Sequence, residues 1–166
     1  DKTFYTHPGI DISGIVRAMA TNISRMGSNR RPIGASTITQ QVAKNFLLTN
    51  EVSIARKAKE VILALRIERA FTKDRILELY LNEIYLGFGS YGVAAAALNY
   101  FDKSLDELTL GEAAFLAGLP KAPNNYNPVR RPQAARDRRD YVLNRMASDG
   151  FVTLTTVAVE MANPVT

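Results

Sequence analysis

Apolar residues recur at helical spacing through most of this chain. Near its beginning they follow one face between Asp11, a candidate helix cap, and Gly27, a candidate stop. They are Ile12, Ile15, Val16, Met19, Ile23 and Met26. This spacing is typical of an amphipathic α-helix, which the pattern predicts over residues 12–26. We find no alternation of apolar and polar residues of the kind that is typical of a strand.

Capping signals mark the beginnings of further helices. A hydroxyl residue followed three positions later by Glu or Gln is typical of a capping box. Three such pairs occur: Thr37 with Gln40, Ser104 with Glu107, and Thr109 with Glu112. Proline is favoured in the first turn of a helix, so Pro132 predicts that a helix begins there. The predicted helices after the first cover residues 37–48, 53–70, 72–84, 93–100, 113–119 and 132–148.

The same periodicity predicts which sides of two long helices are buried. For residues 53–70 the expected inner face is Ala58, Val61, Ile62 and Leu65. For residues 72–84 it is Ile76, Leu77 and Tyr80. Loops rich in glycine or proline separate the helices at residues 27–34, 85–92 and 120–132. Without an internal repeat or a heptad array, the chain is predicted to form a single, mainly α domain.

Composition narrows the chemistry of this chain. It has 166 residues, enough for one buried core, and it contains no cysteine and a single histidine. Disulfides, thiol catalysis and thiolate metal sites are excluded, and a zinc cluster or a Ser-His-Asp triad is not expected. No apolar run approaches the ~20 residues of a membrane span. The chain begins in polar sequence without a signal peptide, so we expect it to be a segment of a longer protein.

The charge balance favours an anionic partner. Lys and Arg total 21 against 16 Asp and Glu, which leaves a net charge of +5. Nucleic acid, phosphate groups and a lipid surface all fit this balance, and so does a basic face exposed to solvent. The charge alone does not choose among these.

One polar helix face is a candidate ligand site. Thr37, Gln40, Gln41 and Lys44 lie at i, i+3, i+4 and i+7, so a helix places them on one side. Ser36 adds a hydroxyl where the helix begins, and free backbone N–H groups there favour an anion. The segment therefore fits a phosphate or a sugar, although a solvated helix face has the same pattern.

The next helix carries a second candidate. Arg56, Lys57 and Glu60 stand at i, i+1 and i+4, which is expected to bring Glu60 close to both cations. The alternative is an exposed intrahelical salt bridge, worth only ~0.3–0.5 kcal/mol. In a cleft, the two cations could instead bind a diphosphate, with Glu60 orienting them, moving a proton or holding a divalent ion. The apolar residues between the two helices, within 46–54, fit either a membrane-binding surface or the core.

Five segments in order resemble a known family. They are DKTFYTHPGID (1–11), GASTITQQVAKN (34–45), RKAKEVILALRIE (56–68), KDRILELYLNEIYLG (73–87) and YGVAAAALNYFDK (91–103). They are similar to the motifs of the glycosyltransferase domain of class A penicillin-binding proteins, the peptidoglycan glycosyltransferases of family 51. The resemblance covers essentially the whole chain. It implies a lysozyme-like fold with a large helical lobe and a small mobile lobe over residues 27 to 55.

The resemblance also implies a reaction. These enzymes polymerise lipid II into β-1,4 glycan strands with inversion and release undecaprenyl diphosphate at the outer, periplasmic face of the bacterial cytoplasmic membrane. Lipid II, the growing strand, moenomycin-type inhibitors and a membrane surface near Phe46 to Ile54 are the implied partners. Nucleic acid is not expected, because the cations form no continuous basic helix. A flanking membrane helix and a transpeptidase domain are usual in the family.

Matching the motifs assigns roles to individual residues. The family's general base is a Glu that would directly precede Asp1, so Glu60 is the catalytic carboxylate within this chain. Glu60 is also the candidate ligand if Mg²⁺ or another divalent cation takes part, although no cofactor is expected to be required. The implied substrate contacts are Asp1, Phe4, His7, Thr37, Gln41, Lys44, Asn45, Arg56, Lys57, Tyr85, Lys121 and Asn124. The polar helix face adds Ser36 and Gln40 as candidate contacts. For Phe4 and Tyr85 ordinary aromatic packing remains an alternative.

The sequence departs from the family pattern in two ways, and these departures leave two other functions open. The preceding Glu lies outside the sequence, and Val52 stands where the family often has Arg. A non-catalytic module that binds lipid II or the membrane is therefore the main alternative. A lysozyme-like hydrolase is the second, and it would cleave finished glycan while ignoring the lipid diphosphate.

Overall fold

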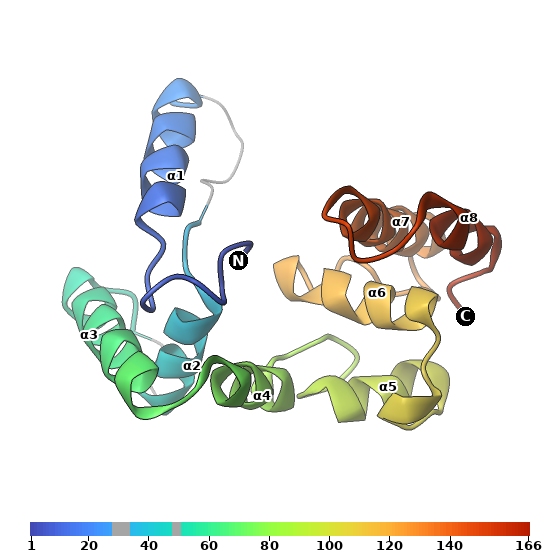
Figure 1. Cartoon of the computed structure of the whole chain (residues 1–166), viewed down its shortest axis with the longest axis horizontal. Helices are drawn as coiled ribbons and strands as arrows, with labels where there is room; N and C mark the ends of the chain where they lie inside the picture. Colours follow the sequence, from blue (N-terminus) through green and yellow to red (C-terminus); the bar gives the residue numbers. More distant parts are fainter. Residues whose placement is uncertain (28–33, 48–50) are drawn as a thin grey trace. The chain divides into compact units, whose positions relative to one another are not determined.

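The computed structural model describes residues 1–27, 34–47 and 51–166, and its described segments are mainly helical (Figure 1). The chain divides into two compact units, Asp1–Tyr80 and Leu81–Thr166. The small lobe predicted for residues 27–55 stays a prediction, because residues 28–33 and 48–50 lie outside the described segments. The predicted loop at 27–34 and the predicted helix end near 48 fall largely on these same residues.

The first unit contains α1 (Ile12–Ser24), α2 (Ile38–Phe46), α3 (Ile54–Ala70) and most of α4 (Lys73–Glu83). Each of the first three begins at a residue whose side chain accepts a hydrogen bond from the first turn, and the predicted box of Thr37 and Gln40 is confirmed. Helices α2 and α3 pack against each other (Figure 1). Tyr80, at the end of this unit, is buried together with Ile76 on the predicted face of α4.

The second unit is built around α6 (Leu110–Gly118), which packs against α5 (Val93–Phe101), α7 (Pro132–Ser148) and α8 (Leu154–Ala162). Two short 3₁₀ turns, η1 (Leu105–Glu107) and η2 (Leu119–Lys121), connect them. Phe115 is fully buried, and the rings of Tyr100 and Phe101 meet it edge-on. Both predicted capping boxes and the helix beginning at Pro132 are confirmed here.

The buried face predicted for α3 is wrong at two of its four positions, because only Val61 and Leu65 are partly buried, and the apolar face of α1 is exposed. On α1, the side chains of Val16, Met19 and Ile23 are 59–66% exposed, and the buried residue is Ala18. On α3, Ala58 and Ile62 are exposed, whereas Ala64 and Ile67 are buried. Periodicity locates a helix, but the side that is buried depends on which element packs against it. No sequence pattern predicted α8. Within the described segments the β pairing is one isolated bridge between Tyr85 and Tyr91.

None of the helices described in residues 1–27, 34–47 and 51–166 is both long enough and apolar enough to cross a membrane.

Candidate functional site

The segment before α1 is hydrogen-bonded to the beginning of α2. The Asp1 carboxylate accepts a hydrogen bond from the backbone N–H of Ile38, 2.8 Å away, where the helix dipole favours a negative charge. The hydroxyl of Thr37 donates to the carbonyl of Gly9 at 2.7 Å. Gly9 has a φ of +114°, and a Cβ there would lie 3.1 Å from the carbonyl oxygen of Ala64 on α3. The N-terminal segment therefore reaches α2 and α3 only because this position is glycine.

Asp1 and His7 form a buried pair. Nε2 of His7 lies 2.9 and 3.0 Å from the two carboxylate oxygens of Asp1, and the side chains of His7 and Asp1 are 4% and 5% exposed. The ring of Phe4 is buried and meets the imidazole edge-on at 5.8 Å. These contacts give Phe4 the packing role that the sequence left as an alternative. Both Asp1 oxygens already accept hydrogen bonds, which suits an orienting carboxylate better than a base.

The polar face predicted for α2 has a buried part and an accessible part. Thr37 and Gln40 are buried at 2% and 3% exposure, and their side-chain oxygens accept the N–H bonds of the capping box. Both side chains therefore hold the beginning of α2, and their contact with a ligand stays a prediction. Gln41 is partly exposed, and Lys44 and Asn45 are exposed near the end of the helix. These last three keep the accessibility that a ligand contact requires.

Glu60 and Lys57 form the pair that the sequence predicted. Nζ of Lys57 lies 2.8 Å from Oε1 of Glu60, one turn apart on α3. The Glu60 side chain is 7% exposed, whereas the Lys57 side chain is 51% exposed. Lys57 also donates to the hydroxyl of Ser36 at 2.8 Å, so it bridges α3 and the segment before α2. A buried carboxylate thus holds an ammonium group whose other side reaches solvent.

Arg56 behaves differently from the prediction that placed it beside Glu60. Its Nη1 donates to the carbonyl of Glu51 at 2.7 Å. Its Nε and Nη2 are buried and have no hydrogen-bond partner among the described residues. Unpaired buried donors on a cation are costly, and an anionic ligand satisfies them better than any other group. Of the two cations expected beside Glu60, Lys57 contacts it, whereas Arg56 donates to the carbonyl of Glu51.

Glu60 as a ligand of a divalent cation stays a prediction. Within them, no group of three or more His, Asp or Glu side chains comes together, and the Glu60 carboxylate already faces the Lys57 ammonium. Mg²⁺ prefers several oxygen ligands, with one or two carboxylates among them. No step is therefore derived through a metal ion.

Three of the candidate residues lie in the second unit. The hydroxyl of Tyr85 donates to Oδ1 of Asn124 at 3.5 Å, and its ring packs on Tyr91 at 4.9 Å. Lys121, in η2, is exposed on the same loop. The fold thus brings Tyr85 and Asn124 together from positions far apart in the sequence.

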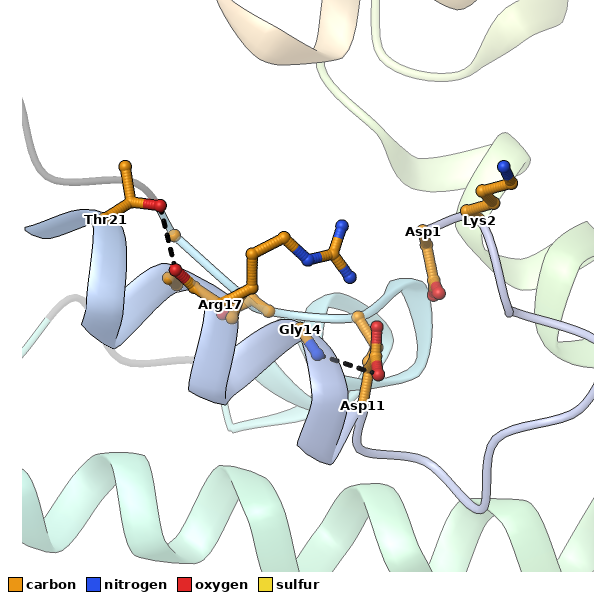
Figure 2. A pocket seen from close by; sticks show the side chains of 11 residues that line it. Asp1, Lys2, Asp11, Gly14, Arg17 and Thr21 are labelled. Atoms are coloured by element: carbon orange, nitrogen blue, oxygen red, sulfur yellow. Dashed lines mark hydrogen bonds between the residues drawn. The ribbon is translucent and has the colours of Figure 1, made fainter. Parts of the chain in front are cut away.

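A pocket of about 310 Å³ opens between α1 and the segment that leads into α2. Figure 2 shows Arg17 extending from α1 on one side and Asp1 and Lys2 standing on the other. Asp11 contributes a carboxylate, and Ser36, Thr37 and Thr21 contribute hydroxyl groups; the remaining lining residues are Gly14, Ala18, Gly34 and Ala35. Charges of both signs beside hydroxyls suit a ligand rich in hydroxyl and amide groups, such as a sugar.

Sequence reasoning missed Lys2, Asp11 and Arg17 as lining residues. Asp11 was noticed as a helix cap, a role that the structure confirms through its bond from the N–H of Gly14. For Arg17 the only available signal was a cation within an apolar helix, which carries no information about the loop that faces it. The pocket exists because residues 34–37 lie against α1, and this is a tertiary contact.

Comparison with known proteins agrees with the order of the motifs. A family model described as transglycosylase matches residues 1–147. Penicillin-binding protein 1A of Rickettsia prowazekii is 59% identical over 99% of this chain, and that of Neisseria flavescens is 53% identical over 93%. The matches cover 21% and 19% of those proteins, so the chain spans about a fifth of the length of these relatives.

A solved structure shows the same similarity. Penicillin-binding protein 1A from Haemophilus influenzae aligns with 82% of this chain and 18% of its own, with a TM-score of 0.55 and 38% sequence identity. The predicted mainly α, lysozyme-like fold agrees with this neighbour and with the helical structure described above.

Proposed function

We propose, because this chain belongs to the transglycosylase family, that it is a peptidoglycan glycosyltransferase domain of the class A penicillin-binding protein type and that it polymerises lipid II. Its partners would be lipid II, the growing glycan strand and the released undecaprenyl diphosphate. The observation that carries the proposal is the cationic beginning of α3. There, Arg56 has two buried donors without a described partner, and Lys57 is held by the buried Glu60.

The reaction requires positive charge beside the diphosphate leaving group. The 4-hydroxyl oxygen of the acceptor sugar attacks the anomeric carbon of the growing strand, and its proton passes to the general base. The bond from that carbon to the diphosphate oxygen breaks, and the electron pair leaves with the undecaprenyl diphosphate. Attack and departure on opposite faces invert the anomeric centre. The negative charge that develops on the diphosphate is lowest in energy where fixed donors already face it.

The residues of this chain supply those donors. The unpaired Nε and Nη2 of Arg56 can bind two phosphate oxygens at once, because a guanidinium is planar. Glu60 fixes Lys57 at 2.8 Å while half of that lysine side chain stays accessible. Glu60 would thus act on the leaving group through Lys57. The base itself, a Glu before Asp1, is carried over from the family resemblance, and the buried Asp1–His7 pair would orient it.

The pocket between α1 and residues 34–37 supports the sugar side of the proposal. It borders Asp1, so a sugar hydroxyl bound there would lie near the residue that precedes Asp1. Its hydroxyl groups and its two cations, Lys2 and Arg17, match the hydroxyl, amide and carboxyl groups of a disaccharide that bears a peptide.

Polymerisation is the direct test. A protein that includes the Glu expected before Asp1 is incubated with lipid II, and the glycan products and free undecaprenyl diphosphate are separated and measured. We expect strands longer than one disaccharide pair, and we expect moenomycin to compete for the site. Binding of lipid II without any product would favour the non-catalytic module. Cleavage of finished glycan without polymerisation would favour the hydrolase.

A membrane-facing surface is the second part of the proposal, in which the domain works at the periplasmic face of the cytoplasmic membrane, as the family resemblance implies. Phe46, Val52 and Ile54 are 53%, 97% and 91% exposed. The exposed Lys44 and the half-exposed Lys57 are their neighbours along the chain. Exposed apolar groups beside cations favour anionic lipid. The arrangement also suits a substrate with a lipid tail.

Changing Val52 and Ile54 to Asp is expected to weaken binding to vesicles of anionic phospholipid by about tenfold, because two apolar contacts are lost. Co-sedimentation measures the bound fraction. Asp is tolerated at the beginning of a helix, so α3 should still form. The control is Val129→Asp, since Val129 is 87% exposed in the second unit. Equal binding by both variants and the unchanged protein would contradict the assignment of this surface.

A further inference from the structure

Lys73 is the centre of a network that the proposed mechanism does not use. From the beginning of α4, its Nζ donates to Oε1 of Glu68 at 2.6 Å and to the backbone carbonyl of His7 at 2.6 Å. It also lies 3.3 Å from Nδ1 of His7 and 4.7 Å from the centre of the Phe4 ring. The same Glu68 oxygen accepts a hydrogen bond from the hydroxyl of Thr39 at 2.7 Å. The network therefore joins α2, α3, α4 and the N-terminal segment.

These contacts determine where His7 carries its proton. The backbone N–H of Gly9 points at Nδ1 from 3.0 Å, and an N–H can only donate. The ammonium of Lys73 can only donate as well, and it faces the same nitrogen. Nδ1 must therefore be an acceptor without a proton. The proton of the neutral ring is then on Nε2, where it is donated to the Asp1 carboxylate.

The charges around His7 agree with a neutral ring. Burial lowers the pKa of His7 from its ordinary value of 6.5, and the positive charge of Lys73 lowers it further. Glu68 and Asp11 act in the opposite direction but more weakly. The Asp1 carboxylate, which accepts from Nε2, also favours the protonated ring and so acts against burial and Lys73. A second proton on Nδ1 would face two hydrogen-bond donors at once. Lys73 therefore opposes protonation of Nδ1 in two ways, by its positive charge and by its position as a donor.

We propose that Lys73 and Glu68 are positioning residues, which keep His7 neutral with its proton on Nε2 and thereby hold the Asp1 carboxylate at the beginning of α2. Glu68 fixes Lys73, Lys73 and Gly9 occupy Nδ1, and Nε2 orients Asp1. The importance of this chain of contacts for catalysis rests on the proposed function, because Asp1 is the neighbour of the expected general base. The arrangement of His7 itself does not rest on it.

The single histidine makes this arrangement directly measurable. In the ¹⁵N-labelled protein, long-range ¹H–¹⁵N spectra contain one imidazole, whose two nitrogens differ in chemical shift according to which one is protonated. We expect a protonated Nε2 and a bare Nδ1 at neutral pH. In Lys73→Met the midpoint of the His7 titration is expected to move to higher pH, because a nearby positive charge is gone. Lys73→Arg, which keeps the charge, should return the midpoint towards that of the unchanged protein.

Further variants control for a general effect of lost charge and for loss of the fold. Lys103 and Glu112 form a comparable pair in the second unit, with Nζ and Oε1 2.8 Å apart, so Lys103→Met should leave the His7 midpoint unchanged. Lys73→Met leaves Glu68 without its cation and could unfold the protein. The double variant Lys73→Met with Glu68→Gln removes both charges and keeps the acceptor for Thr39. It should show a smaller upward movement, because the loss of Glu68 acts in the opposite direction to the larger effect of losing Lys73. A proton on Nδ1 in the unchanged protein, or a midpoint that moves in none of these folded variants, would overturn the proposal.

Stability gives an independent measure. Because the folded protein holds His7 at a lowered pKa, the unfolded chain binds more protons below pH 6.5. The contribution of His7 to the free energy of unfolding is therefore complete above pH 6.5 and is lost as the pH falls from there through the lowered pKa of the folded state. Denaturant unfolding at several pH values should show this loss, and Lys73→Met should reduce its pH dependence.

Measuring polymerisation of lipid II distinguishes a failure of this inference from a failure of the proposed function. If lipid II is polymerised, Lys73→Met is expected to lower kcat by about tenfold with little change in KM, because the substrate still binds while the carboxylates are misplaced. Lys73→Arg should recover most of the rate. If the unchanged protein does not polymerise lipid II but the His7 titration moves as expected, the proposed function fails and the arrangement of His7 stands. An unchanged kcat in Lys73→Met, together with a moved titration, would remove the link to catalysis.

Discussion

Glu60→Gln is expected to abolish polymerisation of lipid II, with a loss in kcat of about a thousandfold or more. The amide has nearly the shape of the carboxylate, so α3 and its packing should persist. It lacks the negative charge that holds the Lys57 ammonium at 2.8 Å. Lys57 would then no longer be fixed where the charge on the diphosphate develops, and preorganised groups of this kind are among the largest contributions to catalysis. The rate of glycan formation by the protein extended to include the preceding Glu is the measurement.

A matched substitution isolates the effect of charge. Asp137→Asn makes the same acid-to-amide change on the exposed face of α7, where the side chain accepts a hydrogen bond from Gln133 at 2.7 Å. This variant should polymerise at the unchanged rate. Thermal unfolding of both variants checks that the fold is intact. Near-normal polymerisation by a folded Glu60→Gln protein would remove Glu60 from the mechanism.

Arg56→Ala is expected to lower kcat/KM by about a hundredfold, because two charge-assisted hydrogen bonds to the diphosphate are lost at about 1.5 kcal/mol each. Arg56→Lys should recover only part of this loss, since an ammonium cannot satisfy two phosphate oxygens in the planar arrangement of a guanidinium. The free energy of unfolding should change little. Nε and Nη2 have no described hydrogen-bond partner to lose, and Nη1 has only the carbonyl of Glu51.

Arg66 provides the control for charge on the same helix. It is exposed on α3, three turns beyond Arg56, so Arg66→Ala removes one positive charge without touching the beginning of the helix. Steady-state kinetics with lipid II and calorimetric binding of moenomycin should both distinguish the two alanine variants. Equal kinetics for Arg56→Ala and Arg66→Ala would mean that Arg56 does not contact the diphosphate.

Local sequence predicted the beginnings of helices well. The capping boxes of Thr37, Ser104 and Thr109 and the first-turn position of Pro132 all appear in the structure. These features are decided within four residues, where a side chain meets the backbone of the next turn. The helix of residues 154–162 was missed although Thr153 caps it, because that cap is followed at N3 by Thr156 and not by Glu or Gln.

Buried faces were predicted less well, for a reason that α3 illustrates. Its apolar positions fit more than one inner face, and Ile62 is 53% exposed while Glu60 is 5% exposed. Which side is buried depends on the packing of α2 against α3, which no periodicity within α3 contains. The apolar face of α1 shows the same limit, since Val16 and Met19 are exposed despite their spacing.

The sequence by itself determined the helical composition, the caps, the family and the pair of Lys57 and Glu60, because each depends on residues close together along the chain or on motifs in order. Only the tertiary structure decided that Thr37 and Gln40 are buried supports, that Arg56 has unpaired donors, and that a pocket lies beside Asp1. The contact between Lys73 and His7 joins residues 66 positions apart. Such a contact determines which imidazole nitrogen carries the proton, and it cannot be predicted from the spacing of residues along the chain.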